Sequence, residues 1–183
     1  TVFEKAQKMD YALWGQSSNL KGLNFKIEDA PTFVPMTQNA PIYVKLNGHD
    51  YEVYQNSYKE FEEYMKSIFT NDFLSQDSIE KKFANYNGKL AVCDDYDLAQ
   101  IPYFTGYVGE YYPDDFCSVR YYLKNKTEAQ VNFVMIAYYN PNETYEVHDE
   151  YSYDDMNKVE YEMQLVKVGY VWRVNKYHSP ELG

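Results

Sequence analysis

The chain opens with apolar residues spaced three or four positions apart, as on one face of a helix: Val2, Ala6, Met9 and Leu13. This spacing predicts an amphipathic helix that ends at Gly15. Residues 16–38 then mix polar side chains with two prolines. Irregular structure is expected there.

Alternation of apolar and polar residues on both sides of a turn replaces the helical spacing over residues 42–54. Two alternating runs, 42–46 and 49–54, flank the dipeptide Asn47-Gly48. Asn-Gly is typical of the type I′ turn, in which both central residues need a positive φ. The pattern therefore predicts a β-hairpin.

A second helix is predicted directly after this hairpin. Ser57 and Glu60 have the spacing of a capping box. The apolar face that follows has members at i, i+3, i+4 and i+7: Phe61, Tyr64, Met65 and Ile68. A further short helix is expected over 72–84, and the turn Asn87-Gly88 is expected to lead into a strand over 89–93.

The rest of the chain has the pattern of an antiparallel sheet. Strands are expected over 101–108, 117–124, 130–139, 145–151, 160–165 and 170–174. In the fifth of these, Tyr161, Met163 and Leu165 alternate with charged or polar residues, as in a strand with one wet face. No strand alternates with a long helix, so a parallel α/β sheet is not expected.

The predicted fold class is therefore α+β, with N-terminal helices and a hairpin packed on a curved antiparallel sheet. A length of 183 residues fits a single domain over 1–183. A division into a helical and hairpin lobe, 1–86, and a β-rich lobe, 87–183, is the alternative.

Charge adds a constraint on partners. The chain has 17 Lys and Arg against 28 Asp and Glu, a net charge of −11. Such a field repels nucleic acid and anionic membranes and favours cationic partners. The acids gather in two blocks, 90–119 and 141–162. Each block is either ordinary solvated charge or an acidic docking face for a basic partner.

The first block also contains aromatic residues, and the whole chain has 22 Tyr. Tyrosine suits half-exposed strand positions as well as binding surfaces. An aromatic anchor with a charged rim is one pattern of a protein interface. The candidate docking surface consists of Asp94, Asp95, Tyr96, Asp97, Tyr111, Tyr112, Asp114 and Asp115.

The sequence lacks the common catalytic and metal-binding motifs. The chain has no nucleophile elbow, phosphate-binding glycine loop or zinc-peptidase helix. Asp95 and Asp97 have the first spacing of an EF-hand loop, but Gln100 stands where that loop needs glycine. No enzyme activity, cofactor or metal is therefore expected.

The chain has three histidines and two cysteines. His49 is expected to be exposed beyond its turn, His148 at a strand edge, and His178 near a frayed end. Cys93 and Cys117 form either one disulfide or two buried thiols, and the thiols are favoured. No apolar run of about 20 residues suggests a transmembrane segment.

Several short motifs, taken in order, resemble a known family. They are the first helix with Trp14, then the segments 46–51, 61–70, 87–91 and 169–174. Together they are similar to the IseA-type inhibitors of bacterial cell-wall D,L-endopeptidases. The last segment also resembles NTF2/cystatin-like sheets.

This resemblance implies a secreted or surface-attached protein of a Gram-positive-type bacterium. It also implies a non-enzymatic role, in which the protein blocks the cysteine-dependent active cleft of a peptidoglycan hydrolase. The matching motifs are structural ones, so no inhibitory residue is carried across.

Two functions follow from these observations. The first is a monomeric, non-catalytic extracellular binding protein that inhibits a basic cell-wall hydrolase through its acidic, Tyr-rich surface. The alternative is an NTF2-like pocket domain of a surface lipoprotein, which binds a small ligand or sugar. An enzyme on the same scaffold would need buried titratable groups that converge in one cavity, such as His148 with a carboxylate.

Overall fold

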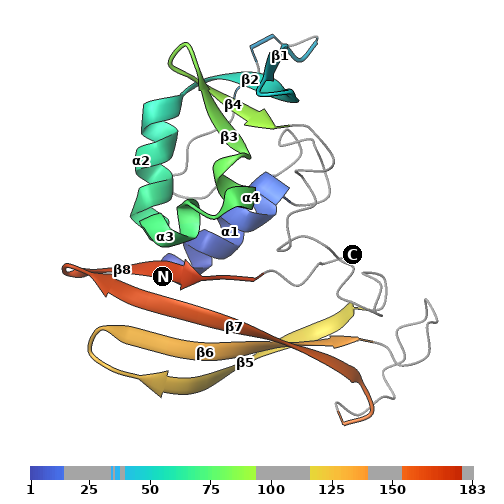
Figure 1. The fold of residues 1–183 in the computed structure, drawn as a ribbon. Helices are drawn as coiled ribbons and strands as arrows, with labels where there is room; N and C mark the ends of the chain where they lie inside the picture. The colour runs from blue at the N-terminus through green and yellow to red at the C-terminus, as the bar shows by residue number, and fades with distance from the viewer. Residues whose placement is uncertain (15–33, 35, 38–39, 94–115, 140–153, 179–183) are drawn as a thin grey trace. The chain divides into compact units, whose positions relative to one another are not determined.

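The computed structural model of the chain describes residues 1–14, 34, 36–37, 40–93, 116–139 and 154–178 (Figure 1). The chain divides into two compact units. The first unit is Thr1–Ile101 with Trp172–Val174, and the second is Pro102–Val171 with Asn175–Gly183. The described strands form two antiparallel sheets of four strands each, which confirms the α+β class.

Both long helices of the first unit were predicted. Helix α1 spans Val2–Trp14, and its Ala6 and Met9 are buried. Helix α2 spans Tyr58–Ile68 and buries Phe61, Met65 and Ile68. The Ser57 hydroxyl accepts a hydrogen bond of 3.3 Å from the Glu60 amide, which is one half of the predicted capping box.

The first sheet lies in the first unit and has the strand order β1-β2-β4-β3. Its strands are β1 Tyr43–Leu46, β2 His49–Ser57, β3 Phe83–Tyr86 and β4 Lys89–Cys93. Both predicted turns are present, with positive φ at Asn47 (52°) and Gly48 (90°) and at Asn87 (52°) and Gly88 (82°). Helix α2 contacts β2, β3 and β4.

The prediction of one helix over 72–84 is wrong over its second half. Two single-turn helices, α3 Asn71–Leu74 and α4 Asp77–Glu80, occupy the first half. The chain then becomes β3, which pairs with β4 across the second turn. Because β4 also pairs with β2, the predicted hairpin is extended into a four-stranded sheet of its own.

The second sheet is a meander with the order β5-β6-β7-β8. Its strands are β5 Phe116–Lys126, β6 Gln130–Tyr139, β7 Asn157–Val168 and β8 Val171–Lys176. They confirm the strands predicted over 117–124, 130–139, 160–165 and 170–174. The strands expected over 101–108 and 145–151 lie outside the described residues.

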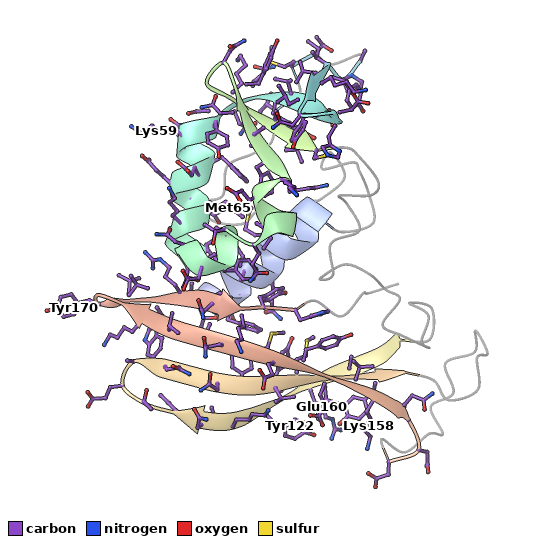
Figure 2. The ribbon with its side chains drawn as sticks, viewed as in Figure 1. Lys59, Met65, Tyr122, Lys158, Glu160 and Tyr170 are labelled. Atoms are coloured by element: carbon purple, nitrogen blue, oxygen red, sulfur yellow. The ribbon has the colours of Figure 1, made fainter. Side chains whose placement is uncertain are left out.

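The predicted alternation along β7 holds over residues 160–163 and not at Leu165, which is half-buried like Gln164. Tyr161 and Met163 are buried and Glu162 is exposed. Glu160 is exposed as well (Figure 2). The buried residues pair with Met135 and Phe133 of β6. One face of this sheet is therefore apolar and the other carries charge.

Strand β8 contributes to both units. The Val174 side chain is fully buried, and its carbonyl accepts a 2.9 Å hydrogen bond from the Thr70 amide in the first unit. The Arg173 Nε donates to the Lys66 carbonyl at 2.9 Å. One residue further on, the Asn175 side chain donates to Gln164 of β7, in the second unit.

Among the described residues, no helix combines the length and the apolar character needed to cross a membrane.

Candidate functional site

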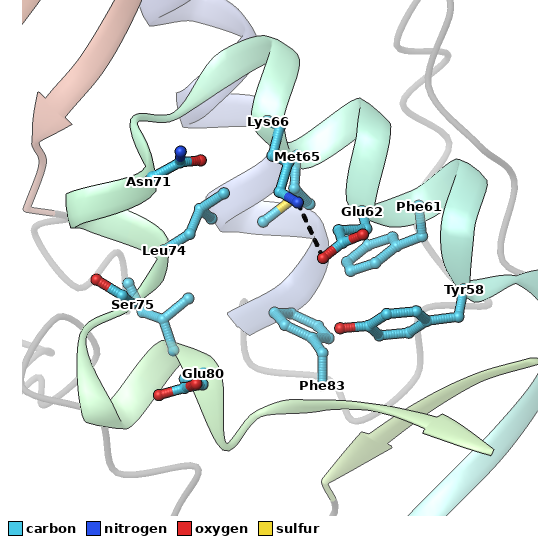
Figure 3. Close-up of a pocket in the computed structure, with 11 residues that line it drawn as sticks. Tyr58, Phe61, Glu62, Met65, Lys66, Asn71, Leu74, Ser75, Glu80 and Phe83 are labelled. Carbon is cyan, nitrogen blue, oxygen red and sulfur yellow. Dashed lines mark ion pairs between the residues drawn. The ribbon is translucent and has the colours of Figure 1, made fainter.

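A pocket of about 330 Å³ opens in the first unit, on the side of α2 that faces α3, α4 and β3 (Figure 3). Its walls come from elements close together in sequence, all between Tyr58 and Phe83. This volume is at the lower end of the range of about 300–1,000 Å³ that is typical of small-ligand sites. The pocket is therefore the candidate functional site.

The floor of the pocket is apolar. Phe61 and Met65 of α2 are buried, as is Ile79 of α4. The rings of Phe61 and Phe83 lie 4.8 Å apart between centroids, tilted by 52°. Leu74 of α3 lies across the pocket from these rings (Figure 3). A ligand that enters would place an aliphatic or aromatic group against these side chains.

The rim of the pocket is charged. Glu62 and Lys66 form an ion pair of 3.0 Å between Oε1 and Nζ, and both side chains are about half exposed. Glu80 also lines the pocket, is exposed, and forms no ion pair with any described residue. The pair cancels its own charge, so the free carboxylate leaves the rim with a net negative charge.

Tyr58 connects the rim to the floor. Burial raises the pKa of its hydroxyl, and the nearby carboxylate of Glu62 raises this pKa further. Lys66 lowers it by a smaller amount, and Glu80 raises it by less still. The hydroxyl therefore stays protonated and can donate a hydrogen bond. The backbone amide of Tyr58 donates a 3.0 Å hydrogen bond to the Gly88 carbonyl, which connects the start of α2 to the β3–β4 turn.

Local sequence explains why the chain folds back to make this pocket. Helix α2 ends at Ile68, and Thr70 then caps α3 through a 3.1 Å hydrogen bond from the Phe73 amide to its hydroxyl. Helix α3 ends at Leu74, and the Ile79 amide bonds the Gln76 carbonyl at 2.8 Å. These two tight turns bring Leu74 and Ile79 opposite α2.

The docking surface predicted from the sequence cannot be placed. Its residues, Asp94, Asp95, Tyr96, Asp97, Tyr111, Tyr112, Asp114 and Asp115, all lie outside the described residues. The same holds for His148 and for the partial EF-hand spacing. That surface therefore stays a prediction.

Two of the histidine predictions are wrong. His49 is half-buried at the start of β2 rather than exposed. His178 is not frayed: its ring stacks on Tyr161 with centroids 3.8 Å apart, and its amide donates to the Met163 sulfur at 3.2 Å. Strand β7 thus provides a packing partner beyond the end of β8.

Cys93 is a buried thiol. The side chain of Cys117 lies outside the described set, so two buried thiols stay a prediction. The described residues include no group of three or more His, Cys, Asp or Glu that could hold a metal ion. The side chains that line the pocket offer a ligand apolar contact, hydrogen bonds and charge.

Sequence reasoning missed the pocket, although one signal was available. An Asn-Gly turn at 87–88 predicts a strand before it as well as after it. A strand over 83–86 would have placed Phe83 beside α2, and Glu62 and Lys66 already have the i, i+4 spacing of an exposed pair. The closing of α3 and α4 over the same helix is not encoded in any local pattern.

Comparison with models of protein families and with curated proteins found no match to this chain.

Proposed function

We propose that the protein is a non-catalytic binding protein whose pocket holds a small ligand with an apolar body and a positively charged group. The observation that carries this proposal is an apolar floor beside the carboxylate of Glu80 on the rim, which forms no ion pair with a described residue.

Two features favour an ammonium ligand over an anion. The Glu80 carboxylate attracts a cation and repels an anion at the mouth of the pocket. The rings of Tyr58 and Phe83 also line the pocket, and their faces attract a cation within about 6 Å. Burial of the apolar part would supply most of the affinity, at about 25 cal/mol per Å² of area removed from water.

Three probes of equal size test this proposal: 3-phenylpropylammonium, 3-phenylpropanol and 3-phenylpropanoate. Titration calorimetry is expected to show the tightest binding for the ammonium and the weakest for the carboxylate. Failure of all three probes to bind would contradict the proposal.

Two variants assign the binding to the pocket. Leu74→Trp fills the cavity and should abolish binding of every probe. Glu80→Gln should weaken binding of the ammonium probe about fivefold, as expected for one partly exposed charge, and leave the affinity for the alcohol unchanged. Glu63→Gln is the matched control, because Glu63 lies on α2 but outside the pocket and is paired with Lys59 at 3.8 Å.

A second candidate function is favoured by the distribution of charge. The described ranges contain 15 of the 17 Lys and Arg residues and 15 of the 28 acids, so they are balanced. Within them, acids of the second block pair with the chain's own lysines: Asp154 with Lys158, and Glu162 with Lys124 and Lys176. The whole net charge of −11 therefore belongs to the other segments, which include the predicted docking surface.

On this basis the second proposal is an inhibitor of a peptidoglycan hydrolase, secreted or attached to the surface of a Gram-positive-type bacterium. A basic partner protein would be steered to the acidic segments, most strongly at low salt. This second proposal also includes a monomeric protein with an IseA-like or NTF2/cystatin-like fold. It rests on the resemblance of the α2 and β3–β4 sequences.

Inhibition of a cysteine-dependent D,L-endopeptidase acting on cell walls tests the second function. A variant with Asn at Asp94, Asp95, Asp114 and Asp115 should inhibit more weakly than the parent chain. The control removes the same charge elsewhere, with amides at Glu63, Asp72, Glu128 and Asp155. Equal loss in both variants, or no inhibition by the parent chain, would reject this function.

A further inference from the structure

Strand β5 is the end strand of the second sheet. It pairs with β6 on one side, from Phe116 to Lys126. Within the part of the chain that the structure describes, no strand pairs with its other side. Alternate residues of such an edge direct their amide and carbonyl groups away from the sheet, where another strand can bind them.

The side chains of this edge are exposed on both faces of the sheet. Residues 120–126 are all exposed, whereas residues 130–138 of β6 are half-buried or buried. Three large side chains follow one another, with exposed fractions of 42% for Tyr121, 46% for Tyr122 and 65% for Leu123. Because adjacent side chains of a strand point to opposite faces, each face presents an apolar contact.

The charge of this edge is opposite to that of the whole chain. β5 contains Arg120, Lys124 and Lys126 and no acid, in a protein of net charge −11. Lys124 is paired with Glu162 at 3.5 Å, but Glu162 is shared with Lys176. The edge therefore keeps a positive charge.

Tyr122 and Tyr138 lie beside the Arg120 side chain. The Tyr122 hydroxyl is hydrogen-bonded to Tyr138 and Arg120, which lowers its pKa, and Lys158 lies nearby. Lys158 extends from the same face as Tyr122 (Figure 2) and lies 5.8 Å from the centroid of the Tyr138 ring. Arg120 thus gives one face of the edge a cation beside an exposed aromatic ring, whereas Lys158 of β7 is ion-paired with Asp154 at 3.9 Å. Glu160 lies on the same face, in the strand register of Arg120.

A second copy of this chain is a poor partner for the edge. Antiparallel pairing of β5 with itself about Tyr122 places Arg120 of each copy opposite Lys124 of the other. Like charges directly opposite each other destabilise a strand pair. Positive side chains are a common protection of edge strands against such self-association.

We propose that the edge of β5 with which no described strand pairs binds an extended acidic segment of a partner protein as a fifth strand. Backbone hydrogen bonds would supply pairing that is independent of sequence, and the acids of the segment would face Arg120, Lys124 and Lys126. Apolar residues at alternate positions would pack on Tyr121, Tyr122 and Leu123. This site involves no residue of the pocket and is independent of the proposed functions.

The probe is a seven-residue peptide, Glu-Val-Glu-Thr-Glu-Val-Glu, with blocked ends and a fluorophore. Anisotropy should show binding to the full chain that weakens as salt rises, because the contacts are exposed. The same peptide with Lys in place of Glu should bind at least about tenfold more weakly. Two further peptides keep the acidic sequence and have N-methyl groups at alternate residues, one along each edge of the extended peptide. Only the peptide methylated on the edge that pairs with β5 should lose binding.

Variants of the protein place the peptide on β5. The double variant Lys124→Glu, Lys126→Glu should bind the acidic peptide about tenfold or more weakly than the parent chain does. Lys167→Glu is the control for charge reversal, because Lys167 is an exposed residue of β7 away from this edge. Circular dichroism of all variants separates loss of binding from loss of fold.

Protection of β5 amides from hydrogen exchange by the acidic peptide gives a readout that charge attraction alone would not produce. Equal binding of the Lys peptide, or full binding of both N-methylated forms, would overturn the proposal. So would a dimer of the free protein, measured by sedimentation, that disappears in a Leu123→Pro variant.

Discussion

Two glycines allow the turns that set the pairing of the first sheet. Gly48 and Gly88 have φ values of +90° and +82°, which L side chains rarely adopt. A Cβ at either position would meet no atom within 4 Å. The cost of a side chain at these turns is therefore conformational and not steric.

Gly88→Ala should lower the free energy of unfolding by about 1–2 kcal/mol, because the left-handed backbone region is unfavourable for alanine. Gly88→Asn should cost less, since asparagine tolerates this region. Urea unfolding followed by circular dichroism measures both. Equal costs for Ala and Asn would show that the backbone conformation is not the cause.

Side-chain amides link all four strands of the second sheet. The Asn132 Nδ2 donates to Asn125 of β5 at 2.6 Å, and its Oδ1 accepts from Gln164 of β7 at 2.8 Å. Gln164 in turn accepts from Asn175 of β8. Gln130 adds a further bond of 2.9 Å to Asn132. Asn132 is therefore the centre of a ladder of cross-strand hydrogen bonds.

Asn132→Ala is expected to destabilise the protein by about 2 kcal/mol, because it removes several net hydrogen bonds and leaves half-buried amides unpaired. Asn157→Ala, in the first position of β7, is the control and should change stability by less than about 0.5 kcal/mol. Thermal and urea unfolding give the comparison. Similar effects of the two substitutions would mean that the ladder contributes nothing to stability.

Glu162 makes the stability of the same sheet depend on pH. Hydrogen bonding and charge from Lys176, and then from Lys124, lower the pKa of its carboxyl. A depressed pKa in the folded state stabilises the fold above the carboxyl's ordinary value of 4.5, and this stabilisation is lost as pH falls through the lower, folded value.

Glu162→Gln should therefore be less stable than the parent chain near pH 7, and the two should converge toward pH 3. Unfolding measured across this range gives the difference. Because the group is exposed, raising the ionic strength should reduce the difference at neutral pH. A difference that persists at low pH would point to lost packing instead of lost charge.

Elements with strong local signals were predictable. The spacing of Phe61, Met65 and Ile68 identified α2, and the Asn-Gly dipeptides identified both turns of the first sheet. Strand β3 was missed because Phe83–Tyr86 is only four residues long and becomes a strand through its pairing with β4. The pocket and the amide ladder depend on strand register and on helices that close over one another, which no local pattern contains.

At the scale of the whole molecule, neither compact unit is a continuous stretch of chain. The first unit includes Trp172–Val174, which are separated from the rest of it by residues 102–171. Val174 is fully buried, and its backbone meets Phe69 and Thr70 just beyond α2. The integrity of an N-terminal unit therefore depends on a residue near the other end of the sequence.

Val174→Ala should destabilise the chain by about 1–2 kcal/mol through the cavity that it leaves. Hydrogen exchange at Phe69 and Thr70 should accelerate more than exchange in β1. Val171→Ala is the control, because Val171 lies on the same strand with 52% of its side chain exposed. Unchanged exchange at Thr70 in the Val174 variant would contradict the link.

This discontinuity has a consequence for biosynthesis. A ribosome releases the first 101 residues well before Val174 is translated, so the nascent first unit must wait for 70 further residues before its last strand segment exists. Until then the apolar surface around Phe69 has no cover from Val174, and a chaperone would meet an incomplete, open form. Completion of the fold is thereby deferred until residues 172–174 have been synthesised.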